Sequence, residues 1–376
     1  MNSIVFVLER YYSVKKALIL TGFNPDACTG GIETFTKTLI SLIELSDIKT
    51  EMICASDFSN TYSLYREFIG KVYASGRSLL PFSSDSYEFV LSNGYYGGGY
   101  FPKKLKTFTV FHSTHAGYAD ALRRLVPLSA YLEIRYIIGE LLEQSSASGA
   151  KIIAVSNRVR SELRNYYGIE DVELIPNPVD AGFFLRIHDK EELRKKYAIP
   201  KNRKVGLFVG RWEISKGRDI AERLMKELND MFWVIVTSTG GETDPPEGEN
   251  ITTLSGLNRT QMREIYGLSD FMLFPSRYEG FGLAAAEAMA SGLPVIGASV
   301  GFLEEVYLNT PFSTMSIPIG LPDKNEIIAK IKDSIHKLFS DEHFYEEISE
   351  KGRDIIANNY DITVWQERMK NILCLN

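Results

Sequence analysis

Residues 271–299, FMLFPSRYEGFGLAAAEAMASGLPVIGAS, combine an acidic loop with a glycine turn in a way that suits a polar, anionic ligand. An apolar run ends at Pro275, Glu279 follows in a polar loop, and the glycine turn at 280–282 leads into an alanine-rich helix expected to begin near Leu283. Glycine lets the backbone approach a ligand closely, and the first turn of a helix presents unpaired N–H groups to an anion.

A second carboxylate, Glu287, lies eight residues after Glu279 and inside the expected helix. A carboxylate accepts two hydrogen bonds from a vicinal diol, which suits Glu287 to a ribose and Glu279 to a sugar ring. Both side chains can then face one ligand that lies across the helix start. The alternative is that Glu287 only complements the helix dipole and that Glu279 is a solvated loop acid.

Residues 204–220, KVGLFVGRWEISKGRDI, place two cations after another apolar run. Arg211 and Lys216 follow the expected strand, and Gly217 opens the next helix. Two cations at the carboxyl end of a strand can neutralise a diphosphate, the group that a nucleotide-sugar donor releases. A chance basic pair at a strand end is common, so this segment indicates a diphosphate site only in combination with residues 271–299.

Gly30 and Gly31 stand directly before a third expected helix, where their N–H groups can reach a phosphate. The segment lacks the G-x-G-x-x-G spacing of a dinucleotide-binding turn. An ordinary glycine-rich turn is the alternative.

Short apolar runs alternate with amphipathic segments along the chain, which predicts parallel sheets covered by helices. In the first half we expect strands at 17–21, 49–55, 88–92, 107–112, 151–156 and 173–176, and helices at 31–46, 119–146 and 157–167. In the second half we expect strands at 204–210, 232–238, 251–254, 271–275 and 294–298, and helices at 216–229, 259–268 and 283–290. The predicted fold class is therefore α/β, with two Rossmann-like, doubly wound domains, 1–180 and 181–361, that face each other across a cleft. Ligands bind such sheets beyond the carboxyl ends of the strands.

Two connecting segments and the C-terminal stretch complete this outline. Residues 92–100, SNGYYGGGY, predict a mobile loop rather than a phosphate-binding turn, because no helix start follows them. The sequence IPNPVD at 175–180 predicts a proline-stiffened connector between the domains. The last amphipathic stretch, within 362–376, is expected to pack back on the first domain.

Composition limits the class of protein. The 376 residues suit two domains, and a net charge of −6 argues against bulk binding of nucleic acid. Three scattered cysteines indicate neither a zinc site nor a disulfide framework and fit a reducing cytoplasm. No apolar stretch reaches the roughly 18–20 residues that span a bilayer, and the N-terminus has no signal-peptide pattern. Basic clusters, at Lys103, Lys104 and Lys106 and at Arg123 and Arg124, leave peripheral membrane contact as a minority interpretation.

Taken together, these segments resemble glycosyltransferase family 4, the retaining glycosyl transferases of group 1, which have the GT-B fold. The resemblance covers essentially the whole chain, in the family's order: GGIE, the strand ending in FHSTH, IPNPVD, GRWEISKG and EGFGLAAAE. The last segment carries the family's two glutamates with seven residues between them. Pro178 stands where glycine is frequent in the family, a mild departure that restricts the flexibility of the connector.

The resemblance implies a role for each candidate residue. Arg211 and Lys216 would bind the donor diphosphate, Glu287 the ribose hydroxyls, and Glu279 the transferred sugar. His112 resembles the family's histidine near the donor sugar; His115 is the rival assignment, and a structural role is the alternative for either. The expected donor-binding set is Gly30, Gly31, Arg211, Lys216, Glu279, Gly280, Phe281, Gly282, Leu283 and Glu287, and the expected catalytic set is His112, Arg211, Lys216 and Glu279.

These features predict a cytoplasmic hexosyltransferase, with contact at the inner face of the membrane as an option. It would move a sugar, with retention, from a UDP- or GDP-sugar to a glycan or lipid-linked acceptor in bacterial surface glycan synthesis. It would need no cofactor and no metal, because no Asp-x-Asp pair is present to hold one. A nucleotide-sugar epimerase of the same architecture and an inactive binding subunit of a transferase complex stay open. A phosphorylase with a lysine-bound pyridoxal cofactor fits less well, because the chain is short for one.

Overall fold

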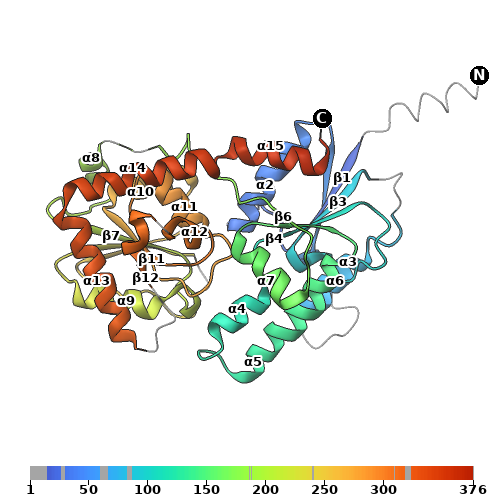
Figure 1. The fold of residues 1–376 in the computed structure, drawn as a ribbon, viewed down its shortest axis with the longest axis horizontal. Helices are drawn as coiled ribbons and strands as arrows, with labels where there is room; N and C mark the ends of the chain where they lie inside the picture. The colour runs from blue at the N-terminus through green and yellow to red at the C-terminus, as the bar shows by residue number, and fades with distance from the viewer. Residues whose placement is uncertain are drawn as a thin grey trace, which may run out of the picture. The chain divides into compact units, whose positions relative to one another are not determined.

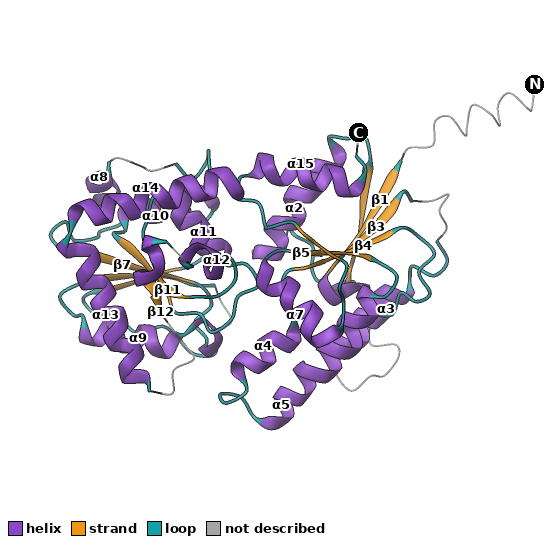
Figure 2. Cartoon of the chain, viewed as in Figure 1, coloured by secondary structure: helices purple, strands orange, loops and turns teal. Residues whose placement is uncertain are grey.

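The computed structural model describes residues 15–26, 30–59, 67–82, 87–185, 187, 189–238, 241–308, 310–317 and 323–375. The chain divides into two compact units. The first consists of Met1–Asp120, Pro127–Ile175 and Gln366–Asn376, and the second of Ala121–Val126 and Pro176–Trp365. Each unit has one parallel sheet with helices on its faces, as predicted (Figures 1 and 2).

The sheet of the first unit has the order β2-β1-β3-β4-β5-β6. Its strands are β1 (Lys16–Thr21), β2 (Lys49–Cys54), β3 (Phe89–Asn93), β4 (Thr107–Phe111), β5 (Lys151–Ala154) and β6 (Val172–Leu174). The helical segments are α2 (Gly31–Glu44), η1 (Ala55–Asp57), α3 (Glu67–Arg77), η2 (Gly94–Gly97), α4 (His115–Leu122), α5 (Leu128–Leu132), η3 (Glu133–Glu143), α6 (Gln144–Ala147) and α7 (Asn157–Tyr167). Strand order reverses at β1, which lies between β2 and β3, so a crevice is expected beyond its carboxyl end.

The predicted continuous helix over 119–146 is wrong. α4 ends at Leu122, and α5 begins only after Pro127, whose ring cannot continue a preceding helix. Beyond α5 the chain is π-helical over Glu133–Glu143 before α6 follows. The amphipathic pattern continues through residues 119–146, so it predicted one helix and gave no sign of the break at Pro127 or of the π-helix.

The prediction of a mobile loop at 92–100 is also wrong. Asn93 ends β3, η2 follows, and Tyr96 and Tyr100 are buried. A side chain on Gly97 would meet the Ser146 hydroxyl at 2.7 Å, and one on Gly99, whose φ is +91°, would meet the Tyr73 carbonyl at 2.6 Å. The glycines therefore serve close packing and not mobility.

The sheet of the second unit has the order β12-β11-β10-β7-β8-β9, the strand order of a Rossmann fold. Its strands are β7 (Val205–Val209), β8 (Phe232–Val236), β9 (Ile251–Leu254), β10 (Phe271–Phe274), β11 (Val295–Ala298) and β12 (Ser316–Ile317). The helical segments are α8 (Lys190–Lys196), η4 (Ile214–Lys216), α9 (Arg218–Glu227), α10 (Arg259–Leu268), α11 (Leu283–Ala290), α12 (Leu303–Tyr307), η5 (Pro311–Met315), α13 (Lys324–Ser340), α14 (Glu342–Asn359) and α15 (Ile362–Leu373). Strand order reverses between β7 and β10, so a ligand crevice is expected beyond the carboxyl ends of these two strands.

Asp270, just before β10, fixes the amino ends of β7 and β10 to each other. Its carboxylate accepts the Val205 amide at 2.6 Å, Arg194 Nη2 at 2.7 Å and Lys190 Nζ at 2.8 Å. Burial by itself would raise the pKa of Asp270, but Lys190, Arg194 and the amide outweigh it and hold the pKa below its usual value. The two strands that carry the candidate site at their carboxyl ends are therefore joined through the Asp270 carboxylate at their amino ends.

Candidate active site

The loops after β7 and β10 pack directly against each other. Gly217, with φ at +76°, ends η4, and a Cβ there would lie 2.2 Å from the Pro275 carbonyl oxygen. The Arg277 amide donates to the Ser215 carbonyl at 2.8 Å, and its guanidinium donates to the Ile214 carbonyl at 2.6 Å. Only glycine at 217 permits this contact, because a side chain would have to overlap the neighbouring backbone.

Arg277 was not singled out from the sequence, although it joins the two loops. Besides its backbone contacts it forms an ion pair with Asp219 at 2.8 Å, on the first turn of α9. Asp219 also pairs with Lys324 at 2.6 Å. An arginine beside the tyrosine of a polar loop carries no signal of such a role, since its partners lie about sixty residues away.

Lys216 and Glu279, predicted separately, are in contact. Lys216 Nζ lies 2.7 Å from Glu279 Oε1, and the Ser276 hydroxyl donates to the same oxygen at 2.9 Å. Their side chains are 23% and 14% exposed, so the pair is partly shielded from water but reachable. A cation and an acid are therefore held together beyond the carboxyl ends of β7 and β10.

Arg211 lies in the same loop but is more exposed. Its Nη2 is 3.0 Å from Glu213 Oε1, and its side chain is 56% exposed. Glu213 is buried and also accepts the Ser215 hydroxyl. Arg211 is therefore exposed enough to meet an anionic ligand, while Ser215 keeps a hydrogen bond to the buried carboxylate.

The start of α11 has the features of an anion site. Its N-cap, Gly282, has φ at +97°. Among the described residues, the amides of Phe281, Gly282 and Leu283 have no protein acceptor. These N–H groups and the helix dipole favour a negative charge at this position.

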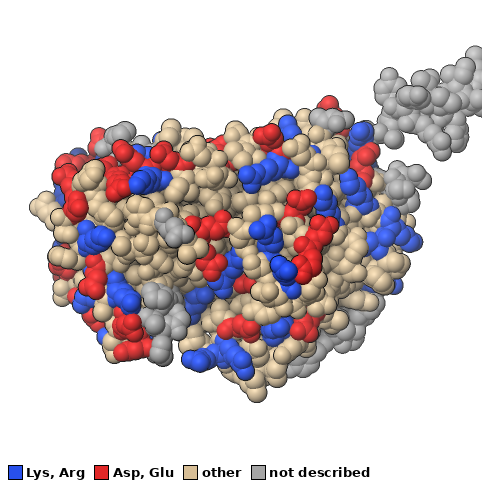
Figure 3. Space-filling view, viewed as in Figure 1, with Lys and Arg blue, Asp and Glu red and all other residues tan. Residues whose placement is uncertain are grey.

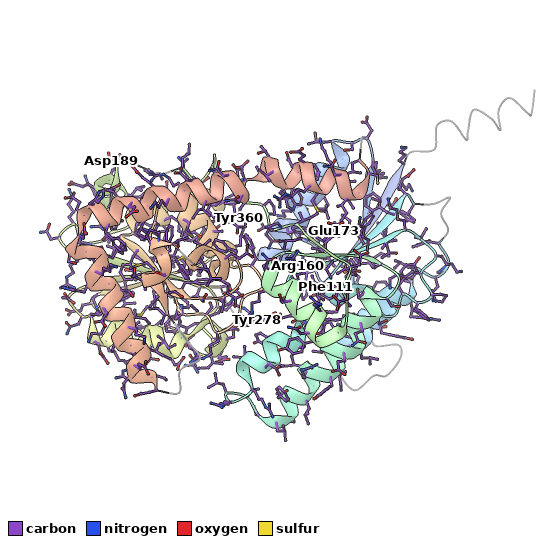
Figure 4. All side chains as sticks on the ribbon, viewed as in Figure 1. Phe111, Arg160, Glu173, Asp189, Tyr278 and Tyr360 are labelled. Atoms are coloured by element: carbon purple, nitrogen blue, oxygen red, sulfur yellow. The ribbon has the colours of Figure 1, made fainter. Side chains whose placement is uncertain are left out.

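The ring of Phe281 is packed in the core, so only its backbone is placed to meet a ligand. The ring is 3% exposed, stacks on Phe302 at 5.0 Å and meets the ring of Tyr360, labelled in Figure 4, at 5.7 Å. Its carbonyl accepts the Phe302 amide at 3.0 Å. This packing holds the turn in place through the Phe281 ring and carbonyl, while the amides of Phe281, Gly282 and Leu283 stay available as donors.

Glu287 lies on α11 with its carboxylate bound by the Tyr266 hydroxyl of α10 at 2.9 Å. Burial raises the pKa of Glu287 to about 7, against smaller opposing effects of Tyr266 and Arg259. Glu279 and Glu287 thus have different partners. The sequence spacing alone could not identify Tyr266, which belongs to another helix.

In the first unit, α2 begins at Gly31 with Gly30 as an extended N-cap. The Glu33 carboxylate folds over Gly30, since a Cβ on Gly30 would lie 2.5 Å from Glu33 Oε2. A phosphate at this helix start would first have to displace that carboxylate. Phosphate binding by Gly30 and Gly31 stays a prediction that the charge of Glu33 opposes.

The two candidate histidines have different surroundings. His112 follows Phe111, the last residue of β4 and labelled in Figure 4, and its Nε2 lies 3.1 Å from Asn93 Oδ1. His115 begins α4, where its Nδ1 lies 2.8 Å from Oε1 of the buried Glu143. The His115 amide donates to the same carboxylate at 3.0 Å, as in a helix cap. This arrangement favours a structural role for His115 and leaves His112 as the better candidate.

Comparison with known proteins gives matches in both halves of the chain. The model described as Glycosyltransferase Family 4 matches residues 29–183, and that described as Glycosyl transferases group 1 matches residues 189–355. D-inositol 3-phosphate glycosyltransferase of Segniliparus rotundus is 29% identical over 187 residues, 45% of this chain and 41% of that protein. An uncharacterised 41.2 kDa protein in the cps region of Klebsiella pneumoniae is 30% identical over 157 residues, 41% of each chain. The matched part is less than half the length of these curated relatives.

Solved structures share the fold over nearly the whole chain. Sucrose-phosphate synthase of Thermosynechococcus elongatus superposes with a TM-score of 0.75 at 17% identity, covering 96% of this chain and 98% of that one. WaaG, a glycosyltransferase involved in lipopolysaccharide biosynthesis, gives 0.70 at 16% identity, with 95% and 99% covered. Anabaena HepE in complex with UDP-glucose gives 0.69 at 15%, with 96% and 99% covered. At such identities the likeness establishes the fold alone.

Replacing Glu287 with Gln should raise the free energy of unfolding at pH 8. The pKa of Glu287 is about 7 in the folded chain against an ordinary 4.5, so between these values the folded state keeps a proton that the unfolded state has lost. Stability therefore falls as the pH rises through this window. Gln avoids the loss and keeps an oxygen for Tyr266. We expect a gain of roughly 1–3 kcal/mol at pH 8 and almost none at pH 4, measured by urea unfolding.

The matched control is Glu264→Gln. Bonds from Lys196 and Tyr197 hold the pKa of Glu264 below its usual value, so this variant should lose stability at pH 8. An equal gain for Glu287→Gln at both pH values would show that its carboxyl does not titrate as described.

Proposed function

Because this chain belongs to glycosyltransferase family 4 and has the GT-B fold, we propose that it transfers a hexose from a UDP- or GDP-sugar to an acceptor hydroxyl with retention at the anomeric carbon. The observation that carries the proposal is the contact of Lys216 with Glu279 beside the free amides of α11. A cation and a helix start suit a diphosphate, and the adjacent carboxylate suits sugar hydroxyls.

The proposed reaction breaks the bond between the anomeric carbon and the diphosphate oxygen. Negative charge then grows on the leaving nucleoside diphosphate, and Lys216, Arg211 and the amides of Phe281 and Gly282 stabilise it. The acceptor oxygen bonds to the same face of the sugar, and its proton passes to the departing phosphate oxygen. Glu287 accepts the ribose hydroxyls, and Glu279, once Lys216 turns to the diphosphate, accepts hydroxyls of the sugar.

Several relatives support the donor and acceptor classes. Structures of HepE hold UDP-glucose or UDP with glucose, and a structure of S. aureus TarM holds UDP and α-GlcNAc-glycerol. WaaG acts in lipopolysaccharide biosynthesis, and one curated relative lies in a cps region. We therefore propose a glycan or lipid-linked acceptor in bacterial surface glycan synthesis, and a cytoplasmic site of action.

The proposed chemistry uses neither a metal nor an organic cofactor. In the part of the chain that the structure describes, no group of three His, Cys, Asp or Glu side chains converges as metal ligands would. The positive charge comes instead from Arg211, Lys216 and the helix start. On the face drawn in Figure 3, basic and acidic side chains are interspersed, which suits a sugar-nucleotide enzyme better than one that binds nucleic acid.

The proposal predicts turnover in excess EDTA with retention. A thermal-shift panel of nucleoside diphosphates and their sugars first identifies the donor, because binding raises the melting temperature. NMR of the product anomers then follows the transfer. Loss of activity in EDTA with rescue by manganese, or an inverted product, would contradict the mechanism. An epimerised sugar without transfer would indicate an epimerase, and donor binding without turnover a binding subunit.

Lys216→Ala and Glu279→Gln should separate two roles at the ion pair. Removing Lys216 should lower kcat by about 10²–10³-fold, with a smaller effect on donor binding, because its charge matters most as the diphosphate leaves. Glu279→Gln should lower kcat while the affinity for free nucleoside diphosphate holds. Steady-state kinetics and calorimetry give these values.

The matched control for this pair is Lys196→Ala. Lys196 forms an ion pair of the same 2.7 Å length with Glu264, away from both loops. Its kinetics should equal those of the wild type. An unchanged kcat in Lys216→Ala, or an equal loss of nucleotide affinity in Lys216→Ala and Glu279→Gln, would refute the assigned roles.

Two lysines of the basic cluster before β4 donate to backbone carbonyls of the fold. Lys103 Nζ donates to the Ser145 carbonyl at 3.0 Å and to that of Ser148 at 2.6 Å, and burial lowers its pKa to about 8. Lys104 Nζ donates to the Leu80 carbonyl at 3.1 Å. These lysines are therefore poor candidates for membrane contact. No helix of the described residues is long and apolar enough to cross a bilayer.

We propose that a row of exposed apolar side chains on α5 and η3 makes the peripheral membrane contact instead. Its members are Leu128, Leu132, Tyr136, Ile137 and Leu141, which are 69%, 44%, 46%, 38% and 63% exposed. A π-helix has about 4.4 residues per turn, so Leu132 and Leu141, nine residues apart, lie on the same face of η3. In an α-helix of about 3.6 residues per turn, the same spacing would place Leu141 on the opposite face. The exposed Arg124 lies four residues before Leu128, within about 14 Å along the chain. An apolar row with a nearby cation is typical of a helix at an anionic lipid surface.

The double variant Leu128→Ser/Leu141→Ser should weaken binding to vesicles that contain anionic lipid. The expected loss is at least about tenfold, because each leucine contributes on the order of 1.5 kcal/mol when it leaves water. Leu45→Ser is the control, since Leu45 is 76% exposed but lies outside the row. Sedimentation with vesicles that fails to distinguish these variants would point to a soluble acceptor.

A further inference from the structure

Asn93, at the end of β3, connects α2 to the candidate histidine by a chain of hydrogen bonds. It is 1% exposed, its Nδ2 donates to Thr36 Oγ1 at 2.9 Å, and its Oδ1 lies 3.1 Å from His112 Nε2. Thr36, fully buried on α2, donates its hydroxyl proton to the Ile32 carbonyl at 2.7 Å. None of the roles described above uses Asn93 or Thr36.

The direction of this chain follows from counting protons. The Thr36 hydroxyl has one proton, and the Ile32 carbonyl receives it, so toward Asn93 the hydroxyl can only accept. The amide nitrogen of Asn93 must therefore face Thr36, and the amide oxygen must face His112. An amide oxygen only accepts, which requires the proton of a neutral His112 to be on Nε2.

The ring of His112 is held from a second side. Phe35, the neighbour of Thr36 on α2, meets the imidazole edge to face at 4.6 Å between centroids and 75° between planes. β3 and β4 are paired, with Asn93 opposite Val110, so Asn93 and His112 leave the same edge of the sheet. Phe35 and Asn93 thus both contact the imidazole, and Thr36 contacts Asn93.

We propose that Asn93, held in turn by Thr36, is a positioning residue that keeps the His112 proton on Nε2 and so makes neutral His112 a hydrogen-bond acceptor toward its ligand. The single proton of the neutral ring lies on Nε2 and is donated to Asn93 Oδ1, so Nδ1 carries no proton and can only accept. A ligand of His112 must therefore bring its own donor, and a sugar hydroxyl does so whereas an ionised phosphate oxygen does not. The choice of a sugar hydroxyl as the ligand rests on the proposed function, because it assigns His112 to a hydroxyl of the transferred sugar.

Nitrogen NMR of the histidine rings tests the tautomer directly, without any substrate. The full chain, labelled with ¹⁵N, has five histidines, and His112→Gln assigns the signals of His112. At a pH where the ring is neutral, two-bond ¹H–¹⁵N correlations should show the proton on Nε2. A proton on Nδ1, or a mixture of tautomers, would overturn the proposal.

Thr36→Val and Thr36→Ser form the matched pair for this test. Val removes the hydroxyl that orients the Asn93 amide, so the single tautomer should become a mixture, whereas Ser should keep it. Asn93→Asp, which can only accept at this pH, should also keep the proton on Nε2. A wild-type tautomer in Thr36→Val would show that the chain of bonds does not orient the ring. Val has almost the volume of Thr, and these variants leave Asn93 in place, so the test does not depend on the folding of Asn93→Ala.

Sugar transfer provides the second readout. Asn93→Ala and Thr36→Val should lower kcat about tenfold, the equivalent of one hydrogen bond, and leave the affinity for free nucleoside diphosphate unchanged, because that ligand carries no sugar. A normal tautomer in a chain without transferase activity would contradict only the proposed function. An equal loss of nucleotide affinity would overturn the assignment of His112 to the sugar.

Discussion

The site of the second unit depends on the close contact between Gly217 and the Pro275 carbonyl. The loops after β7 and β10 leave the same end of two neighbouring strands, where strand order reverses, but only a residue without a side chain lets them touch. Arg277 then ties the loops through the backbone of η4. The contact of Lys216 with Glu279 follows from this arrangement, since each residue belongs to one of the two loops.

The candidate ligand-binding charges of the second unit are held in contacts that a ligand can replace. Lys216 is bound by Glu279, Arg211 by Glu213, and Glu287 by the Tyr266 hydroxyl. Burial raises the pKa of Glu287, so the ionised carboxylate costs stability above neutral pH.

The two units present different chemistry at the carboxyl ends of their strands. The second unit offers cations and free amides, which suit a diphosphate. The first unit holds His112 through the neutral groups Asn93 and Thr36, which set the tautomer without adding charge. At the start of α2 it places Glu33, whose carboxylate opposes an anion. These differences agree with a division in which the second unit binds the nucleotide and the first contacts hydroxyl groups.

The sequence by itself determined the two parallel sheets, the glycine turn before α11, and the cations and acids that follow β7 and β10. These features depend on local patterns, because strand and helix periodicity and turn residues act over neighbouring positions. Only the tertiary structure decided which atoms meet: Lys216 with Glu279 across 63 positions, and Asn93 with Thr36 across 57. It also showed that residues 92–100 are packed, that the Phe281 ring is buried and that η3 is π-helical. The reason is that such contacts arise from strand order and from the space between elements, and neither is encoded in the periodicity of any one segment.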